Sequence, residues 1–192
     1  MRRVVITEFI SVDGVIEDPG GSENFDRGGW AFQFERGEEG DKFKLDELFE
    51  FDGQLLGRVT YEGFAAAWPE RDDPMGFAER MNSMPKYVVS STLSDPSWNN
   101  TTVLSGDAVE EVRKLKESGD GDLLVAGSAQ LSQALIGGGL VDELRLMVFP
   151  LIIGAGKKLF PDTDGAAPLE LVESKPVGPD GVVISIYRPK GA

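Results

Sequence analysis

Residues 55–60 read Leu-Leu-Gly-Arg-Val-Thr, and this junction decides how the fold is interpreted. An apolar predicted strand ends, a glycine follows, and a helical pattern begins at once. The first backbone N–H groups of a helix have no acceptor within the helix, so such a junction favours a phosphate. Arg58 adds a bidentate donor and Thr60 a hydroxyl. The alternative for this segment is an ordinary turn whose arginine pairs with a surface carboxylate.

A second junction of the same design lies at residues 125–130, Val-Ala-Gly-Ser-Ala-Gln. The preceding residues 123–126 are continuously apolar, as expected for a central parallel strand. Ser128 is the predicted N-cap of the helix that follows. Taken alone, this segment favours plain capping. Helices that follow adjacent parallel strands begin at the carboxyl edge of a sheet, where ligands of α/β proteins bind, so the two junctions together predict one diphosphate between them.

A third polar segment, Ser90, Ser91 and Thr92, follows the predicted strand at residues 86–90. Hydroxyl groups at a strand end can bind a ribose or a ribose phosphate. The alternative is a polar start of a loop.

Strand patterns alternate with helix patterns along the whole chain. The predicted strands are 3–10, 53–56, 86–90, 101–104, 123–126, 144–151, 169–172 and 182–187, and the predicted helices are 41–50, 58–67, one capped by Asp107 and one carrying Leu131 and Leu135. Such alternation indicates right-handed crossovers and a mostly parallel sheet. The last strands, without helices between them, predict an antiparallel edge. We therefore predict a single α/β domain over residues 1–192, with about eight strands and flanking helices.

Composition narrows the classes of partner. The 192 residues contain 19 Lys and Arg against 33 Asp and Glu, giving a net charge of −14. Such a surface repels nucleic acid and anionic membranes, so neither is an expected partner. No apolar stretch approaches 18 residues, so we expect no membrane span and a cytoplasmic protein. The acidic residues 35–41 are expected to form a solvated face, which would oppose a doubly charged phosphosugar.

The absence of cysteine and histidine is more informative. It excludes disulfides, a thiolate nucleophile and a Ser-His-Asp triad, and we expect no metal site. Neither a P-loop nor a G-x-G-x-x-G motif is present. Any catalysis must therefore use carboxylates, tyrosine, lysine, backbone amides or a bound cofactor.

Six segments in this order carry a family resemblance: residues 11–16, 56–62, 88–92, 126–131, 140–146 and 150–156, the last followed by Leu159 and Phe160. As a set they resemble the dihydrofolate reductase-like superfamily. More narrowly, they resemble the reductase domain of riboflavin biosynthesis, which is the C-terminal half of bifunctional deaminase-reductases and occurs in many short bacterial proteins. The resemblance implies a three-layer fold and an NADPH-dependent oxidoreductase that forms a homodimer. Its substrate would be a small heterocycle, such as 5-amino-6-(5-phosphoribosylamino)uracil or dihydrofolate.

The resemblance also implies which residues bind the cofactor. The first loop would cover the nicotinamide, the two glycine-led helix starts would hold phosphate, and the hydroxyl-bearing strand end would face the adenosine 2′-phosphate. In that order the residues are Ser11, Asp13, Gly14, Val15 and Ile16; Gly57, Arg58, Val59 and Thr60 with Ala126, Gly127, Ser128, Ala129 and Gln130; and Ser90, Ser91 and Thr92. Ala126 departs from the pattern, because many relatives have glycine there.

A reductase of this kind also needs a proton donor. In folate reductases the donor is an acidic residue on the helix after the long loop, so the resemblance implies Asp41, which opens the predicted helix at residues 41–50. The alternative for Asp41 is a capping or first-turn acid. Glu8 and Tyr61 are the other candidates.

Two broader questions stay open in the sequence. A non-catalytic, dimeric protein that binds a dinucleotide or a flavin would show the same motifs. For the dimer interface, the candidate elements are the apolar residues 144–153 and the predicted edge strand at residues 182–187.

Overall fold

The computed structural model describes every residue except 161, 163, 164 and 192. One eight-stranded sheet has the strand order β4-β3-β2-β5-β1-β6-β8-β7. The strands are β1 (Val4–Ser11), β2 (Gly53–Gly57), β3 (Lys86–Val89), β4 (Thr101–Leu104), β5 (Leu123–Ala126), β6 (Glu143–Phe149), β7 (Leu169–Val177) and β8 (Val182–Pro189). All pairs from β4 to β6 are parallel, whereas β8 pairs antiparallel with both β6 and β7. The predicted mostly parallel sheet with antiparallel C-terminal strands is confirmed.

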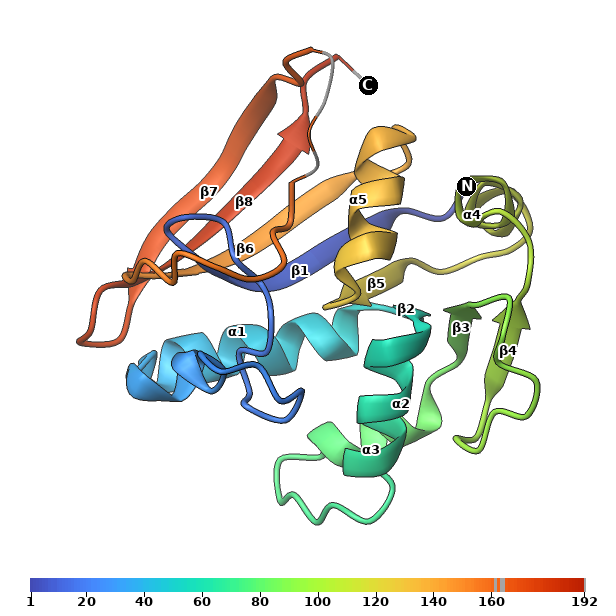
Figure 1. Ribbon diagram of the computed structural model, residues 1–192, viewed down its shortest axis with the longest axis horizontal. Coiled ribbons are helices and arrows are strands. Elements are labelled where there is room, and N and C mark those ends of the chain that lie inside the picture. The colour runs from blue at the N-terminus through green and yellow to red at the C-terminus, as the bar shows by residue number, and fades with distance from the viewer. Residues whose placement is uncertain (161, 163–164, 192) are drawn as a thin grey trace.

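Helices cover both faces of the sheet and give it three layers (Figure 1). They are α1 (Gly37–Glu50), α2 (Arg58–Ala67), α3 (Phe77–Ser83), α4 (Ala108–Glu117) and α5 (Ala129–Gly137), with a short 3₁₀ helix at Trp30–Gln33. Side chains alternate between the two faces of a strand. Leu55 therefore packs in the cluster under α4 and α5, whereas its neighbour Leu56 packs in the cluster formed with α1, α2 and α3.

The predicted elements agree with the structure most closely where a strand meets a helix. The predictions for β4, β5 and α2 have the observed bounds. Helix α1 begins four residues earlier than predicted, because its first turn carries Glu38 and Glu39 and shows no apolar periodicity. Helix α3 has only seven residues, too few for a helical period to stand out, so it was missed within residues 69–85. Strand β7 is longer than predicted, because its exposed residues do not alternate in polarity.

A difference in strand length opens the sheet beside β1. Strand β5 ends at Ala126, which is the register partner of Thr7. Strand β1 continues to Ser11, and from Glu8 onward it pairs only with β6. From Glu8 onward, one side of β1 is therefore left without a neighbouring strand, at the point where the chain of β5 turns away into α5. This gap defines where a ligand can reach the middle of the sheet.

The proposed dimer elements lie inside the sheet instead of at its edge. Strand β6 is buried along nearly its whole length, and β8 lies between β6 and β7, so the prediction of β8 as an edge strand is wrong. The edge strand at this end of the sheet is β7, which carries the exposed apolar side chains of Leu169, Leu171 and Val172. Within the described residues, no helix has the length and apolar character needed to cross a membrane.

Candidate active site

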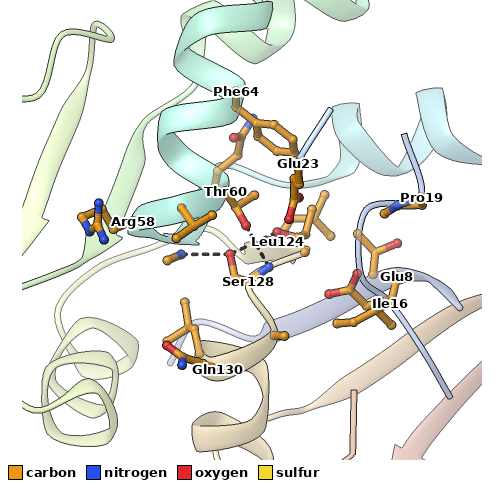
Figure 2. A pocket seen from close by; sticks show the side chains of 18 of the residues that line it. Glu8, Ile16, Pro19, Glu23, Arg58, Thr60, Phe64, Leu124, Ser128 and Gln130 are labelled. Atoms are coloured by element: carbon orange, nitrogen blue, oxygen red, sulfur yellow. Dashed lines mark hydrogen bonds between the residues drawn. The ribbon is translucent and has the colours of Figure 1, made fainter. Parts of the chain in front are cut away.

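A cleft of about 890 Å³ opens at the carboxyl end of the parallel strands (Figure 2). Its volume is at the upper end of the range for small-molecule sites, which suits a dinucleotide together with a second ligand. Many of the predicted site residues line it: Glu8, Ile16, Gly57, Arg58, Val59, Thr60, Ser90, Ser91, Thr92, Ala126, Gly127, Ser128, Ala129 and Gln130. The structure therefore brings the two glycine-led junctions and the hydroxyl-bearing strand end into one site.

Two reciprocal hydrogen bonds hold the junctions side by side. The amide of Gly57 donates to the Ser128 hydroxyl, and the amide of Ser128 donates to the Thr60 hydroxyl, both at 2.9 Å. Ser128 stands at the N-cap position of α5, as predicted, but its backbone is left-handed (φ 60°, ψ 49°) and its side chain forms no capping hydrogen bond with that helix. Its hydroxyl instead ties α5 to the start of α2. Gly127 is also left-handed, and a Cβ there would lie 3.2 Å from the Thr60 hydroxyl oxygen.

Both helices begin at the cleft with first-turn backbone N–H groups that a ligand can bind. The amides of the first turn of α2 and of α5 have no acceptor within their helices, and the cross-bonds use only the amides of Gly57 and Ser128. The side chain of Arg58 is 45% exposed, and its Nη1 donates to both carboxylate oxygens of Glu62 at 2.9 and 3.0 Å. The alternative predicted for this segment, pairing with a surface carboxylate, is thus present. Arg58 remains at the rim of the cleft, where a bound phosphate can compete with Glu62.

The third polar segment, which begins at Ser90, forms hydrogen bonds within its own turn. The Ser90 hydroxyl accepts from the amides of Thr92 and Leu93 at 3.2 and 3.1 Å, which leaves Ser91 and Thr92 exposed at the rim. Gly106 and Asp107, at the start of α4, also line the cleft. The sequence predicted Asp107 as a helix cap, and neither residue was predicted in the site. The Asp107 carboxylate accepts from two first-turn amides of α4, so this helix start already carries a negative charge. The rule that strand ends gather at one edge would have found it.

Glu8 lies at the floor of the cleft, where β1 has lost its neighbour on the β5 side. Its side chain is buried, at 5% exposure, and Oε1 has no hydrogen-bond partner among the described residues. Burial raises the pKa of Glu8 well above its usual 4.5; Lys44 and the Gly127 amide lower it, and the carboxylates of Glu47 and Glu23 raise it further. A carboxyl group in this position holds its proton at higher pH than an exposed one.

A second buried carboxylate stands on the opposite side of β1. Glu47 of α1 is 2% exposed, and its Oε2 accepts a hydrogen bond of 2.8 Å from the Thr7 hydroxyl. Lys44 donates to the same hydroxyl at 2.7 Å and pairs with Glu47. Sequence reasoning missed all three residues. The spacing of Lys44, Glu47 and Leu48 on one face of the predicted helix could have indicated that this charged pair faces the sheet.

Comparisons with known proteins agree with this arrangement. Residues 2–183 match the family model of the RibD C-terminal domain. The chain belongs to this family. It is 30% identical over 193 residues to the protein YyaP of Bacillus subtilis (strain 168), covering 99% of this chain and 96% of that protein.

Two solved structures share the fold. A Shewanella sp. PV-4 protein assigned to riboflavin biosynthesis has a TM-score of 0.77 and 21% identity, covering 98% of this chain and 99% of the other. The dihydrofolate reductase of Enterococcus faecalis, solved with NADP(H) and RAB-propyl, has a TM-score of 0.60 and 17% identity, covering 98% and 96%. Both likenesses concern the fold. They place this RibD C-terminal domain within a dihydrofolate reductase-like architecture.

Two of the three predicted proton donors lie outside the cleft of this RibD C-terminal domain. Asp41 is in the second turn of α1, not at its start, so the capping alternative is wrong as well. Its side chain is 55% exposed and binds Arg36 Nε at 2.6 Å. Tyr61 is 2% exposed, and its hydroxyl accepts from the Trp98 amide at 2.9 Å inside a core cluster. The helix was predicted to begin too late, which placed Asp41 wrongly.

The first loop of this domain, residues 11–16, is held by hydrogen bonds to residues 153 and 154, and most of it does not line the cleft. The Ser11 hydroxyl accepts from the Val15 amide and donates to Asp13, whose carboxylate accepts from the amides of Ile153 and Gly154 at 3.0 and 2.8 Å. These bonds, the Ser11 hydroxyl first, lower the pKa of Asp13 to about 2. Ser11, Asp13, Gly14 and Val15 therefore hold the loop in place, and Ile16 is the residue of this set that lines the cleft.

Proposed function

We propose that the chain is an NADPH-dependent reductase that transfers a hydride to a small heterocyclic substrate. One observation carries the proposal: two helix N-termini are bonded side by side at a cleft whose floor holds a buried carboxyl group. Family membership and the likeness to a dihydrofolate reductase solved with NADP(H) support it. NADPH, when bound, supplies the hydride, and the protein supplies orientation and electrostatics.

The residues present fit the cofactor. Its diphosphate would lie against the first-turn amides of α2 and α5, where the helix dipoles favour an anion. Gly127 keeps that approach open, since it has no side chain between the two helix starts. Arg58 and the hydroxyls of Ser91 and Thr92, at the rim, would face the adenosine 2′-phosphate. A phosphate recognised by arginine favours NADPH over NADH.

Glu8 would supply the proton. Because burial keeps its carboxyl group protonated at higher pH than an exposed acid, it can donate to the nitrogen or oxygen of the double bond that is reduced. Substrate reduction then consumes one hydride and one proton, and the Glu8 carboxylate regains its proton from solvent. Lys44 and the Gly127 amide stabilise the carboxylate in the interval.

The test has two readouts. A ligand at 100 times its Kd stabilises a protein by about 2.7 kcal/mol, so NADPH is expected to raise the Tm measurably, and NADH less. Oxidation of NADPH in the presence of a pterin or a pyrimidine, followed by the loss of NADPH absorbance, would establish turnover. Binding without turnover would favour a non-catalytic dinucleotide-binding protein, and absence of any nucleotide effect would refute the proposal.

We also propose that the chain forms a homodimer, as the family resemblance implies. The exposed apolar side chains of Leu169, Leu171 and Val172 on the edge strand β7 support this surface as the contact. Sedimentation of the Leu171→Glu variant is expected to show a shift toward monomer.

A further inference from the structure

The end of the cleft away from the α2 and α5 junctions is strongly acidic. It is formed by the end of β1, the loop at residues 16–23 and the inner face of α1. Its ionisable side chains are five acids and two lysines: Glu8, Glu17, Asp18, Glu23 and Glu47 with Lys44 and Lys157. With Glu8 protonated, as the proposed function requires, four acids still stand against two lysines, so this end carries excess negative charge, whereas the junction end offers helix N-termini and Arg58.

Neither lysine is available to a ligand without first leaving a carboxylate. Lys157 Nζ binds Glu17 Oε1 at 2.8 Å, and Lys44 pairs with Glu47. The next cation along the loop, Arg27, donates to the Ile153 carbonyl oxygen and does not line the cleft. A phosphate dianion at this end would find no free cation and would face several carboxylates.

Two acids of this end, Glu8 and Glu23, line the cleft. Figure 2 shows both side chains among the residues that line the cleft, Glu8 near Ile16 and Glu23 toward α2. The Oε1 atom of Glu8 is buried and has no hydrogen-bond partner in the described part of the chain. For Glu23, on the loop at residues 16–23, desolvation raises the pKa above its usual value, Lys157 lowers it, and the charges of Asp18 and Glu17 raise it further. A buried polar atom without a partner is costly, so a ligand that brings an N–H or O–H donor to Glu8 would relieve that cost.

We propose, on the basis of the reductase function above, that the substrate is an uncharged or cationic heterocycle without a phosphate group, and that the acidic end of the cleft rejects phosphate esters. Glu8 accepts a donor from the heterocycle, and the carboxylates of residues 17–23 repel a phosphate attached to it. The two ends of the cleft thus sort the ligands by charge: the anionic cofactor lies along the helix starts, and the substrate lies among the acids.

The experiment uses the full chain saturated with NADP⁺, which cannot donate a hydride, so binding is measured without turnover. Calorimetric titration compares 5-amino-6-ribosylaminouracil with its 5′-phosphate, and 2,4-diaminopyrimidine, a weak base, with orotate, an anion. We expect the unphosphorylated and the basic compounds to bind at least about tenfold more tightly at low salt, a difference of about 1.4 kcal/mol. The difference in affinity within each pair should shrink as the salt concentration rises, because screening weakens repulsion between exposed charges.

Two charge-reversal variants locate the effect. Glu23→Lys is expected to reduce the ratio of the two Kd values within each pair of compounds by at least about fivefold, since it replaces a repelling carboxylate by an attracting ammonium. Glu170→Lys makes the same change on the exposed edge strand β7 and is expected to leave the ratio unaltered.

The outcomes separate the two proposals. If NADPH produces no rise in Tm, the reductase function itself fails. If NADPH binds and the 5′-phosphate or orotate binds as tightly as its partner, or if neither compound of either pair binds, the inference about the substrate is overturned while the cofactor site stands.

Discussion

The backbone amide of Ser128 donates a 2.9 Å hydrogen bond to the hydroxyl of Thr60, which lies 68 residues earlier in the chain. In return, the Ser128 hydroxyl accepts the amide hydrogen of Gly57. Each strand-to-helix junction therefore satisfies a polar group of the other. The two helix starts cannot separate without leaving a partly buried amide unpaired, and this fixes the spacing of the donors that would meet an anion.

The first prediction concerns this link. Thr60→Val keeps the shape of the side chain but removes the acceptor, so the Ser128 amide is left without a partner. We expect the free energy of unfolding to fall by about 1–3 kcal/mol, as for a buried donor left unsatisfied, and NADPH affinity to fall with it. Urea denaturation measures the change. Thr102→Val, on the exposed side of β4, is the control and should lose less than about 0.5 kcal/mol.

The second prediction concerns the charged donor at the rim. Arg58→Ala removes a side chain that can bind a phosphate bidentately, and we expect the Kd for NADPH to rise about 10- to 100-fold, as for a hydrogen bond to a charged group. Arg113→Ala is the matched control, because Arg113 forms a similar exposed pair with Glu110 on α4, away from the cleft. An unchanged Kd in the Arg58 variant would exclude the guanidinium from the cofactor site.

The sequence predicted the junctions well because their features are local. A strand, a glycine and a helix start are read from consecutive residues, and the carboxyl-edge rule then brings Gly57 and Gly127 together. The hydrogen bonds that join Ser128 to Thr60 and to Gly57 are not local, so the Ser128 hydroxyl was expected to cap its own helix instead. Asp41 was chosen by its position along the chain, whereas burial decides which acid can hold a proton. Burial at Glu8 and Glu47 arises from strand register and helix packing, which no local pattern encodes.

The third prediction concerns the loop clamp at Asp13. Its folded pKa is lowered to about 2 from 3.8, so the ionised carboxylate stabilises the native state above pH 3.8, and this contribution is lost as pH falls toward 2. Asp13→Asn is therefore expected to lower the free energy of unfolding at pH 6. The difference in free energy of unfolding between the variant and the native chain should shrink as pH falls toward 2. Denaturation at several pH values checks this. A Kd for NADPH changed less than about threefold would separate the clamp from direct binding.

The fourth prediction concerns the space between the helix starts. A Cβ at Gly127 would lie 3.2 and 3.3 Å from two side-chain atoms of Thr60, and φ at Gly127 is +60°. Gly127→Ala is therefore expected to destabilise the fold by about 1 kcal/mol or more and to weaken NADPH binding. Gly63→Ala, within α2 and with no atom within 4 Å of its Cβ, should instead stabilise by about 0.5–1 kcal/mol. Equal effects of the two substitutions would contradict the inference that the space between the two helix starts must stay free of a side chain.

The fifth prediction concerns Glu8, through both catalysis and stability. If Glu8 donates the proton, kcat should fall as pH rises through its raised pKa, and Glu8→Gln should lower kcat by about 10²- to 10⁴-fold and remove that pH dependence. A Glu8→Gln variant that keeps the native pH profile would exclude Glu8 as the donor.

The same raised pKa has a consequence for folding that does not depend on activity. Below its usual pKa of 4.5, Glu8 is protonated in both the folded and the unfolded chain and favours neither. Above 4.5 the unfolded chain releases the proton while the folded chain keeps it, so the stability of the native protein declines until pH passes the folded pKa. Glu8→Gln cannot ionise, so its stability relative to the native chain should be unchanged at pH 4 and should increase toward pH 8. Glu170→Gln on the exposed strand β7 should show no such trend, since its carboxyl group is exposed. A stability difference between the Glu8→Gln and native chains that stays constant from pH 4 to pH 8 would mean that Glu8 ionises as freely in the fold as in the unfolded chain, and the acid proposed for catalysis would then be ionised at neutral pH.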